Sequence, residues 1–563
     1  MGLIKTAYAN CRDCYKCVRS CPIKAIKVVD GHAEIDDERC VLCGRCVPIC
    51  PQNARKVYDQ IALVEKMLQG DKSLTISLAP CFPAAFYRQS ASELVCTLKQ
   101  KGVTRVVETA EVAEVLFDYS SEIEAKEPVI SSYCPAVVSL IEKYYPDLKK
   151  HLAPMVSPLV AHGRYLRKAY PEDYLVFILP CDAKKAEALV EVEIDAVLTF
   201  KELETVLENT PNKIETPESL DIEGVSSSFG RTIGLSGSFK AAVGYGNTLD
   251  TRAESVSGFE ECLEFLDNMQ SGKIGKETKF VEMLLCRGGC LNGSGISTEL
   301  TYEQKKEKII LYAKEKESSQ EKDKKKTITF SKNELLREFN GKPVITPKPT
   351  EEEIREILIS MGKRTKSEEL DCGACGYETC REKADAVFRG FAELEMCIPY
   401  MRTKAETMND VIIQATPNGI IVDDEKLDIV TINPAAEKMF QCRQEALKGK
   451  KVRTLVDDSI FSEVLEKKTL IVDNVEYPNY GLKVRQFIFY VPKSQVVIAI
   501  FADITEQSRQ KDQLSELRKE TLERAQEVIN KQMRVAQEIA SLLGETTAET
   551  KVILDQLMHI IKG

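Results

Sequence analysis

The first 58 residues contain the same cysteine motif twice, and this repeat constrains the fold more than any other feature. CRDCYKCVRSCP begins at position 11 and CVLCGRCVPICP at position 40. Three thiolates in this spacing fit three corners of a 4Fe-4S cubane, and the fourth cysteine of each motif reaches the other cluster. We predict one cubane on Cys11, Cys14, Cys17 and Cys50, and a second on Cys40, Cys43, Cys46 and Cys21.

Zinc is the alternative for this segment, but the interleaved spacing is not typical of zinc sites. A segment this short cannot build a large core, so metal is expected to hold it together.

The composition supports metal or redox chemistry. The chain has 563 residues, 20 cysteines and a formal net charge of −10. We expect a cytoplasmic protein, since no stretch is apolar enough to span a membrane and the N-terminus lacks a signal-type segment. Disulfides are rare in that compartment, so clustered cysteines indicate metal binding. The mild charge gives no reason to expect nucleic acid or membrane partners.

The sequence divides into five predicted domains of mixed α/β and α+β class. Between about 70 and 300, β-forming runs alternate with helical stretches, which predicts an α/β domain with mainly parallel strands. The expected strands are LTISLA, TRVVET, EPVISSYC, YLVFILPC, DAVLTF and RTIGLS. The mixed-charge stretch 303–326 is expected to be a solvated helix and linker. The predicted boundaries are 1–60 (ferredoxin-like, two 4Fe-4S), 61–345 (α/β cluster domain), 346–402 (small helical 4Fe-4S domain), 403–506 and 507–563.

Four further cysteines lie in the α/β region. Cys134 and Cys181 each follow an apolar β-run, and Cys286 and Cys290 lie in the glycine-rich stretch LLCRGGCLNGSG. Ligands collect beyond the carboxyl ends of strands in open α/β sheets. Each cysteine alone would more often be a packed thiol than a ligand.

VISSYCPA, ILPCDAKKAE and VEMLLCRGGCLNGSG resemble the three cluster-binding signatures of FeFe-hydrogenases, in the same order. The resemblance covers roughly residues 1–300 and implies that Cys134, Cys181, Cys286 and Cys290 hold a cubane. It also implies that Cys290 bridges this cubane to a di-iron unit that carries CO, cyanide and a dithiolate. Glycines around the last two cysteines would let the backbone close against a bulky cluster.

The same resemblance implies roles for residues around the di-iron unit. Lys184 matches the lysine that binds a cyanide, and Glu187 matches the acid beside it. The segment APCFPAA, residues 79–85, is similar to the family's pocket segment, so Pro80 and Cys81 are expected to line the unit.

Several positions depart from the catalytic members of that family. Tyr133 stands where they have a cysteine that relays protons. Because tyrosine has a pKa near 10 against about 8.5 for cysteine, proton delivery costs about 2 kcal/mol more. Phe117 and Ala153 fall near further relay positions, and Leu179 and Leu284 replace expected methionines. Binding of the cluster is expected to persist while turnover is slow.

A third cysteine group lies beyond the α/β region. DCGACGYETC supplies Cys372, Cys375 and Cys380, and Cys397 follows. The pattern resembles a small 4Fe-4S domain, although four thiolates also satisfy zinc. Cys96, Cys262 and Cys442 have no companions and are expected to be packed thiols.

The C-terminal third resembles a PAS domain followed by a helix. ATPNGIIVDDEKLDIVTINPAAEKMF matches the opening of the fold, and Asp503, Ile504 and Thr505 resemble its terminal DIT element. Residues 401–510 contain no histidine, so no histidine-bound haem is expected and a cofactor-free PAS domain is favoured. Heptad spacing after residue 507 suits a parallel homodimer or a lone amphipathic helix.

These features predict a sensory FeFe-hydrogenase-like protein. Heterolytic H2 activation would involve Cys290, Lys184 and Tyr133, with four 4Fe-4S clusters, one di-iron unit, and redox state signalled through PAS and the C-terminal helices. Expected partners are H2, a ferredoxin-type electron carrier, hydrogenase maturation enzymes and, because no effector pattern follows the helix, a separate phosphatase or kinase. The alternatives are a catalytic hydrogenase linked to ferredoxin and a cluster scaffold without the di-iron unit.

Overall fold

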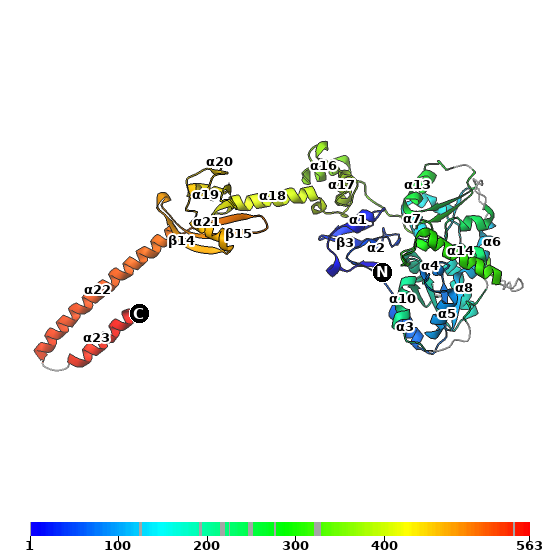
Figure 1. Ribbon diagram of the computed structural model, residues 1–563, viewed down its shortest axis with the longest axis horizontal. Helices are drawn as coiled ribbons and strands as arrows, with labels where there is room; N and C mark the ends of the chain where they lie inside the picture. The colour runs from blue at the N-terminus through cyan, green and yellow to red at the C-terminus, as the bar shows by residue number, and fades with distance from the viewer. Residues whose placement is uncertain are drawn as a thin grey trace. The chain divides into compact units, whose positions relative to one another are not determined.

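The computed structural model describes residues 2–122, 127–190, 194–213, 220–224, 226–245, 252–274, 277–319, 328–543 and 547–562. The chain forms two compact units, Met1–Met401 and Arg402–Gly563 (Figure 1). None of the described helices is both long and apolar enough to span a bilayer.

The ferredoxin module is built from two short antiparallel sheets and two short helices. β1 (Ile4–Thr6) pairs with β4 (Arg55–Val57), and β2 (Ile26–Val29) pairs with β3 (His32–Ile35). Helices α1 (Lys16–Ser20) and α2 (Cys46–Ile49) each lie within one cysteine motif. Its core is small and contains Val18, Ile26, Val28 and Ala33, so most of the cysteines lie near the surface of the module or at its interfaces.

The α/β domain contains two parallel sheets. The first has the order β6 (Arg105–Glu108), β5 (Leu74–Leu78), β8 (Tyr174–Leu179), β9 (Ala196–Thr199), and all three pairings are parallel. The second has the order β10 (Ala253–Ser257), β11 (Phe280–Leu284), β7 (Val129–Ile130). Every residue of β5 and β11 is buried, because parallel strands are covered on both faces.

The strand prediction holds for five of the six runs and is wrong for RTIGLS. Residues Ser228–Thr232 form helix α11, which is capped by the Ser227 side chain accepting from the Gly230 amide at 3.0 Å. The chain then turns, and Leu235 forms only an isolated bridge to Gly289. The serine cap favours a short helix over the β-propensity of the run.

Helix α14 (Tyr302–Ser319) is not the wholly solvated helix that its charge predicts. Ile309 and Tyr312 are buried, and the helix packs on α4 (Phe82–Ala85) and α11. The Tyr312 hydroxyl donates to the buried carboxylate of Glu108. The rest of the predicted linker, residues 320–327, lies outside the described residues.

A small helical domain completes the first unit. It contains α16 (Glu351–Ser360) and α17 (Cys380–Phe388), which pack on each other, and helix α18 (Ile398–Ala415) begins directly after Cys397. Residues 328–347 lead from the α/β domain to this small domain. Within them, Leu336 forms an isolated antiparallel β-bridge to Met155.

The second unit carries one five-stranded antiparallel sheet, the short helices α19 (Pro434–Met439), α20 (Gln444–Leu447) and α21 (Ser459–Lys467), and two C-terminal helices. The strand order is β13 (Ile429–Ile432), β12 (Gly419–Asp424), β16 (Val496–Asp503), β15 (Leu482–Val491), β14 (Ile471–Tyr477). Helices α22 (Thr505–Leu543) and α23 (Thr547–Lys562) follow. The DIT residues join sheet to helix: the Lys483 amide donates to the Thr505 hydroxyl at 2.9 Å and the Thr505 amide to the Asp503 carboxylate at 2.9 Å.

Candidate metal centres

The second ferredoxin motif places its cysteines close to one another. Burial raises the pKa of Cys40 to about 11 and that of Cys43 to about 12, and Cys21 adds a like charge to both. Burial also raises the pKa of Cys46, where Cys43, Cys40 and Cys21 act together. Cys21 therefore lies with the second motif. These clustered thiols resist ionisation when no metal is bound. They fit an iron-sulfur cluster, because its positive iron favours the thiolate form.

Arg55 is a buried cation of the first ferredoxin site that the sequence prediction missed. Its side chain is 4% exposed, and Nη2 donates to Cys17 Sγ at 2.9 Å. Its charge also lowers the pKa of Cys50, the cysteine predicted to complete this site. A guanidinium beside ligand sulfurs stabilises their negative charge.

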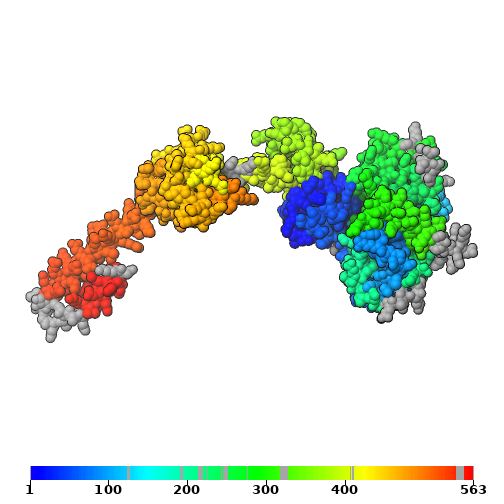
Figure 2. Space-filling model, in the orientation of Figure 1, coloured from blue at the N-terminus to red at the C-terminus, as the bar shows by residue number. Residues whose placement is uncertain are grey.

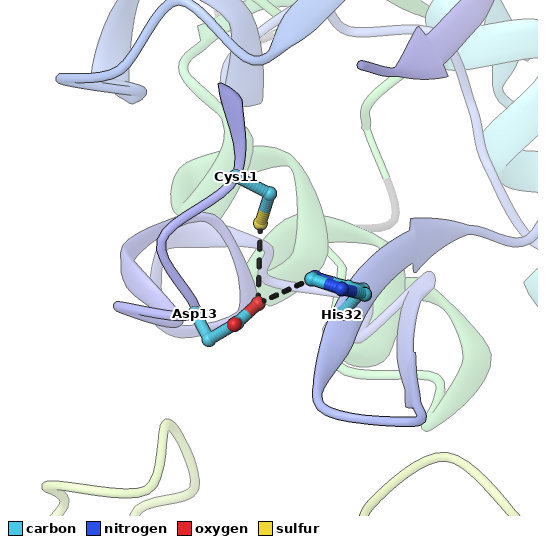
Figure 3. Close-up of side chains that lie close together, drawn as sticks. All are labelled: Cys11, Asp13 and His32. Atoms are coloured by element: carbon cyan, nitrogen blue, oxygen red, sulfur yellow. Dashed lines mark hydrogen bonds and ion pairs between the residues drawn. The ribbon is translucent and has the colours of Figure 1, made fainter. Parts of the chain in front are cut away.

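Cys11 lies at the polar edge of the same site. Its Sγ is 3.4 Å from Asp13 Oδ1, which also contacts His32 Nδ1 at 2.9 Å (Figure 3). Cys11 and Asp13 come from the motif itself and His32 from β3.

The four cysteines of the α/β domain also converge. Cys134 precedes helix α7 (Pro135–Tyr144), Cys181 precedes α9 (Asp182–Ala188), and Cys286 follows β11. Burial raises the pKa values of Cys181, Cys286 and Cys290, and in each case Cys134 adds a like charge; Cys290 adds one at Cys181 and Cys286, and Cys81 adds one at Cys290. They meet at the carboxyl ends of β7, β8 and β11, where ligands bind in such sheets.

Glycines line the space beside Cys290. A Cβ on Gly234 would lie 2.7 Å from Cys81 Sγ and 3.5 Å from Cys290 Cβ. Gly289 has φ +105°, and a Cβ there would lie 2.3 Å from the Gly234 carbonyl oxygen. Side chains are thus excluded where Cys81 and Cys290 approach each other, and this fits a bulky group held close to the backbone.

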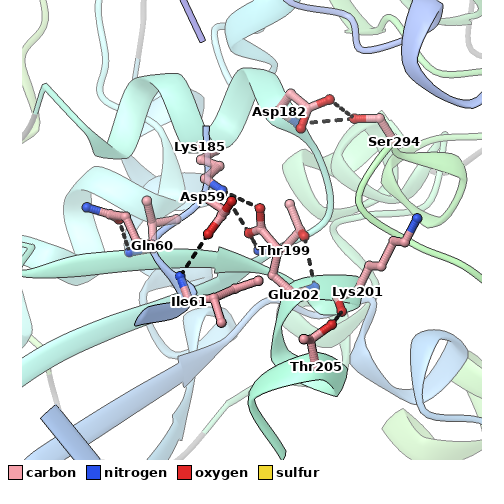
Figure 4. Close-up of polar contacts among 11 residues, drawn as sticks. Asp59, Gln60, Ile61, Asp182, Lys185, Thr199, Lys201, Glu202, Thr205 and Ser294 are labelled. Atoms are coloured by element: carbon pink, nitrogen blue, oxygen red, sulfur yellow. Dashed lines mark hydrogen bonds and ion pairs between the residues drawn. The ribbon is translucent and has the colours of Figure 1, made fainter. Parts of the chain in front are cut away.

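The two adjacent lysines of DAKKAE point to different partners. Lys184 Nζ lies 2.9 Å from Glu187 Oε2, and its charge partly opposes the rise that burial causes in the pKa of Cys290. Lys185 is fully buried, and its Nζ lies 2.6 Å from Glu202 Oε1. Glu202 is in the first turn of the next helix, and its amide donates to the hydroxyl of the capping residue Thr199 (Figure 4). Lys184 is therefore the lysine near Cys290, and Lys185 stabilises the fold.

Glu187 is held ionised within a network. Burial alone would raise its pKa, but Lys184 and Arg337 lower it below the usual range, assisted by the Ser157 hydroxyl. Arg337 Nη1 lies 2.5 Å from Glu187 Oε1, and Ser157 Oγ donates to Oε2 at 2.7 Å. Neither Arg337 nor Ser157 has a sequence motif that would have identified it.

Tyr133 lies in an apolar cluster with the two other predicted relay positions. Phe117, Tyr133 and Ala153 are buried in one core, and the Tyr133 ring packs on Phe239 with centroids 4.3 Å apart. The Tyr133 hydroxyl is buried without a hydrogen-bond partner among the described residues. Nearby Ser120 donates instead to the Leu116 carbonyl. Burial raises the pKa of Tyr133 well above its usual value.

The third group of cysteines surrounds one small cavity. Cys372, Cys375, Cys380 and Cys397 all line it, together with Lys363 and Lys383. The donor set fits a 4Fe-4S cluster and also zinc.

The ferredoxin module docks on the α/β domain through its second motif. Lys143 Nζ donates to the Cys40 carbonyl at 2.7 Å, and Arg45 lies 2.6 Å from Glu260. A cavity of about 510 Å³ is lined by both Cys43 and Cys286. The two cysteine sets are therefore neighbours, as an electron relay requires.

Comparison with known proteins agrees with this arrangement. Residues 72–294 match the model for the iron only hydrogenase large subunit, C-terminal domain, and residues 10–54 match a 4Fe-4S dicluster domain. The chain contains an iron-only hydrogenase large-subunit domain. Residues 368–399 match a model for a candidate Fe-S cluster, and residues 407–473 match the PAS fold.

Curated relatives of the hydrogenase domain fall into two groups. Iron hydrogenase 1 of Clostridium pasteurianum is 25% identical over 277 residues, which are 40% of this chain and 48% of the relative. A cytosolic Fe-S cluster assembly factor NAR1 of Kluyveromyces lactis is 38% identical over 87 residues, or 15% of this chain and 19% of the relative. The chain thus spans less than half the length of these two relatives.

A solved structure of the FeFe-hydrogenase HydA1 from Chlamydomonas reinhardtii is also similar to this chain. It has 17% identity and a TM-score of 0.35, and the match covers 51% of this chain and all of that one.

The other residues that the resemblance singles out have these positions in the structure, and their roles stay predictions. Pro80 and Cys81 follow β5, and Cys81 is buried with its pKa raised by burial to about 12. Leu179 and Leu284 are buried. Among the unpaired cysteines, Cys262 is fully buried, whereas Cys96 and Cys442 are half-buried.

Proposed function

We propose that this chain is a sensory FeFe-hydrogenase, in which hydrogen is split heterolytically and the electrons reduce the 4Fe-4S clusters. The observation that carries the proposal is the close grouping of Cys290, Cys81, Gly234 and Lys184. It combines a thiol that can bridge to a second metal unit, a close backbone approach, and one cation beside that thiol.

Each residue has a defined role in this proposal. The di-iron unit, when bound, supplies the metal centre on which hydrogen is split. Cys290 would hold that unit beside the cubane, and the Lys184 ammonium group would donate to an anionic ligand. Glu187 keeps Lys184 in position, since it is itself fixed by Arg337 and Ser157. Pro80 and Cys81 would line the space for the unit.

The sensory rather than catalytic role rests on the proton path. A proton leaving the site would have to cross the apolar cluster around Tyr133 and Phe239, where no described polar group contacts the Tyr133 hydroxyl. Low turnover suits a protein whose product is a change of redox state. The PAS domain and α22 would then report that state to a separate phosphatase or kinase.

The similarity to NAR1 assembly factors supports a second candidate, a cluster scaffold that holds no di-iron unit. The two functions differ in one spectroscopic feature, because only the di-iron unit carries CO and cyanide.

The test is infrared spectroscopy of protein matured anaerobically with hydrogenase maturation enzymes. We expect CO and cyanide bands and about 18 iron atoms per chain, from four cubanes and one di-iron unit. Cys290→Ser should lose the bands, whereas the matched control Cys96→Ser, at a half-buried cysteine outside every set, should keep them. Absence of bands in the unmodified protein would establish the scaffold function instead.

A further inference from the structure

The small domain that carries the third cysteine set packs directly on the ferredoxin module. One apolar cluster joins Cys17, Val18 and Ile26 to Tyr377 and Met396, and Cys21, Cys46 and Cys375 pack against it. Figure 2 shows the two segments in contact, dark blue against yellow-green. Cysteines of three predicted cluster sites therefore share one core.

Hydrogen bonds to backbone carbonyls stabilise this contact. Val28 N donates to the Phe391 carbonyl at 3.0 Å, and Lys24 Nζ donates to the Gly376 carbonyl at 2.9 Å. Gly376 has φ +99°, and a Cβ there would lie 3.1 Å from Val18 Cγ1. The loop between Cys375 and Cys380 thus approaches the ferredoxin module as closely as a backbone can.

Tyr377 lies between the two sites. It is 4% exposed, burial raises its pKa, and the charges of Cys375 and Cys21 raise it further. One aromatic ring therefore adjoins a predicted ligand of the small domain and a predicted ligand of the second ferredoxin cluster.

Lys383 adds a buried positive charge to the small site. Its side chain is 1% exposed, and Nζ donates to the Leu394 carbonyl at 2.9 Å. In the described part of the chain, no carboxylate lies within ion-pair distance of Nζ. Burial disfavours its charge, and Cys397, Cys375, Glu395 and Cys380 oppose that effect. Lys383 also lines the cavity that the four cysteines surround, so its charge lies beside the predicted ligands.

We propose that the centre on Cys372, Cys375, Cys380 and Cys397 accepts electrons from the ferredoxin module within the same chain, and that Lys383 stabilises its reduced form. One electron leaves a reduced ferredoxin cluster, which becomes oxidised, and reduces the small-domain centre; no proton is transferred. A reduced cluster carries one more negative charge, so a buried cation raises its potential. This inference rests on the proposed function in one respect only, namely that hydrogen supplies the electrons.

The position of the centre gives the transfer a consequence. Cys397 is followed at once by α18, and the Cys397 carbonyl accepts the helical hydrogen bond of the Met401 amide at 2.9 Å. The electron therefore arrives next to the start of α18, close to the end of the first unit at Met401.

The test is an anaerobic redox titration of the full-length protein with dithionite and mediators, followed by electron paramagnetic resonance. Because dithionite replaces hydrogen, the result does not depend on hydrogenase activity. Cys380→Ser, which removes one ligand, identifies the signal of the small centre. Lys383→Met should shift the midpoint potential of that signal downward and leave the ferredoxin signals in place. Lys383→Arg, which keeps the charge, should restore it.

Lys348→Met is the matched control, because Lys348 is an exposed lysine of the same domain that does not line the cavity of the four cysteines, and it should cause no shift. In the unmodified protein, the spin relaxation of the small centre should quicken once the ferredoxin clusters are reduced. Stoichiometric zinc in place of iron, relaxation that ignores the ferredoxin clusters, or an unchanged potential in Lys383→Met would each overturn the inference.

Discussion

At the scale of single residues, Tyr133 is a position where a substitution should increase hydrogen turnover. Its hydroxyl is buried without a partner among the described residues, and burial raises its pKa well above the usual value. A group that so strongly retains its proton is a poor relay.

Tyr133→Cys should therefore increase hydrogen oxidation by about 10-fold, below the 10²–10⁴-fold typical of a complete acid–base relay, because Phe117 and Ala153 leave the rest of the path apolar. Turnover is measured with an artificial electron acceptor. Tyr133→Phe keeps the ring and removes only the hydroxyl, so it should match the unmodified protein. If the unmodified protein already turned over at the rate of Tyr133→Cys, the argument for a sensory role would fail.

Asp423 is a second residue with an unusual environment. It is fully buried in β12, on the same face as Ile421, and neither carboxylate oxygen has a hydrogen-bond partner among the described residues. Burial, with smaller contributions from Asp424 and Asp428, raises its pKa to about 7. A raised pKa means that the folded state binds a proton that the unfolded state releases near pH 4.

The second unit should therefore lose stability as the pH rises from about 4 to about 7, and the loss should level off above that. Asp423→Asn removes the titration, so its stability relative to the parent should grow over the same range, by up to about 4 kcal/mol. Denaturant unfolding of residues 402–563 at several pH values measures this. Asp473→Asn, at an exposed position of β14, is the control, and an equal pH profile for Asp423→Asn and the parent would refute the argument.

At the scale of secondary-structure elements, α22 stands out for the apolar side chains that it exposes. It is 39 residues long, and its apolar side chains are largely exposed: Leu514, Leu517, Leu522, Val528, Val535 and Ile539. An isolated helix gains most of its stability by packing an apolar face. We therefore expect α22 to bind a second protein chain, either another copy or the separate regulator.

The prediction is that a phosphatase or kinase binds α22 with an affinity that differs between hydrogen-reduced and oxidised protein. A switch of this kind typically involves about 1–3 kcal/mol, or 5–150-fold in affinity. Binding is measured with full-length protein and with a truncation ending at Thr505, under hydrogen and under an oxidant. Truncation should abolish binding in both states. Equal affinities in the two redox states would leave α22 as a dimerisation helix.

At the scale of the whole molecule, the first unit arranges its cysteine sets in a continuous series. The hydrogenase-domain set adjoins the second ferredoxin motif across the cavity lined by Cys43 and Cys286. The ferredoxin module in turn adjoins the small-domain set through Tyr377. Electrons released at Cys290 would thus have neighbouring acceptors up to Cys397, where α18 begins.

The local motifs were sufficient to predict the domain types and the parallel sheet. Cysteine spacing within CRDCYKCVRSCP, or the position of Cys181 directly after a β-run, depends on backbone geometry over a few residues, so it can be read along the chain. The same is true of the PAS opening and the DIT residues. RTIGLS misled because its β-propensity competed with a serine cap, and a six-residue run is too short for pattern alone to decide.

The tertiary structure decided which residues surround those motifs. Arg55 beside Cys17, Arg337 beside Glu187 and Tyr377 between two cysteine sets are separated in sequence from their partners by tens to hundreds of residues. The resemblance singled out Lys184, but the role of Lys185 was invisible, because it depends on the ion pair with Glu202. Such contacts follow from how whole domains pack, and packing depends on the shape and burial of surfaces that no local spacing encodes.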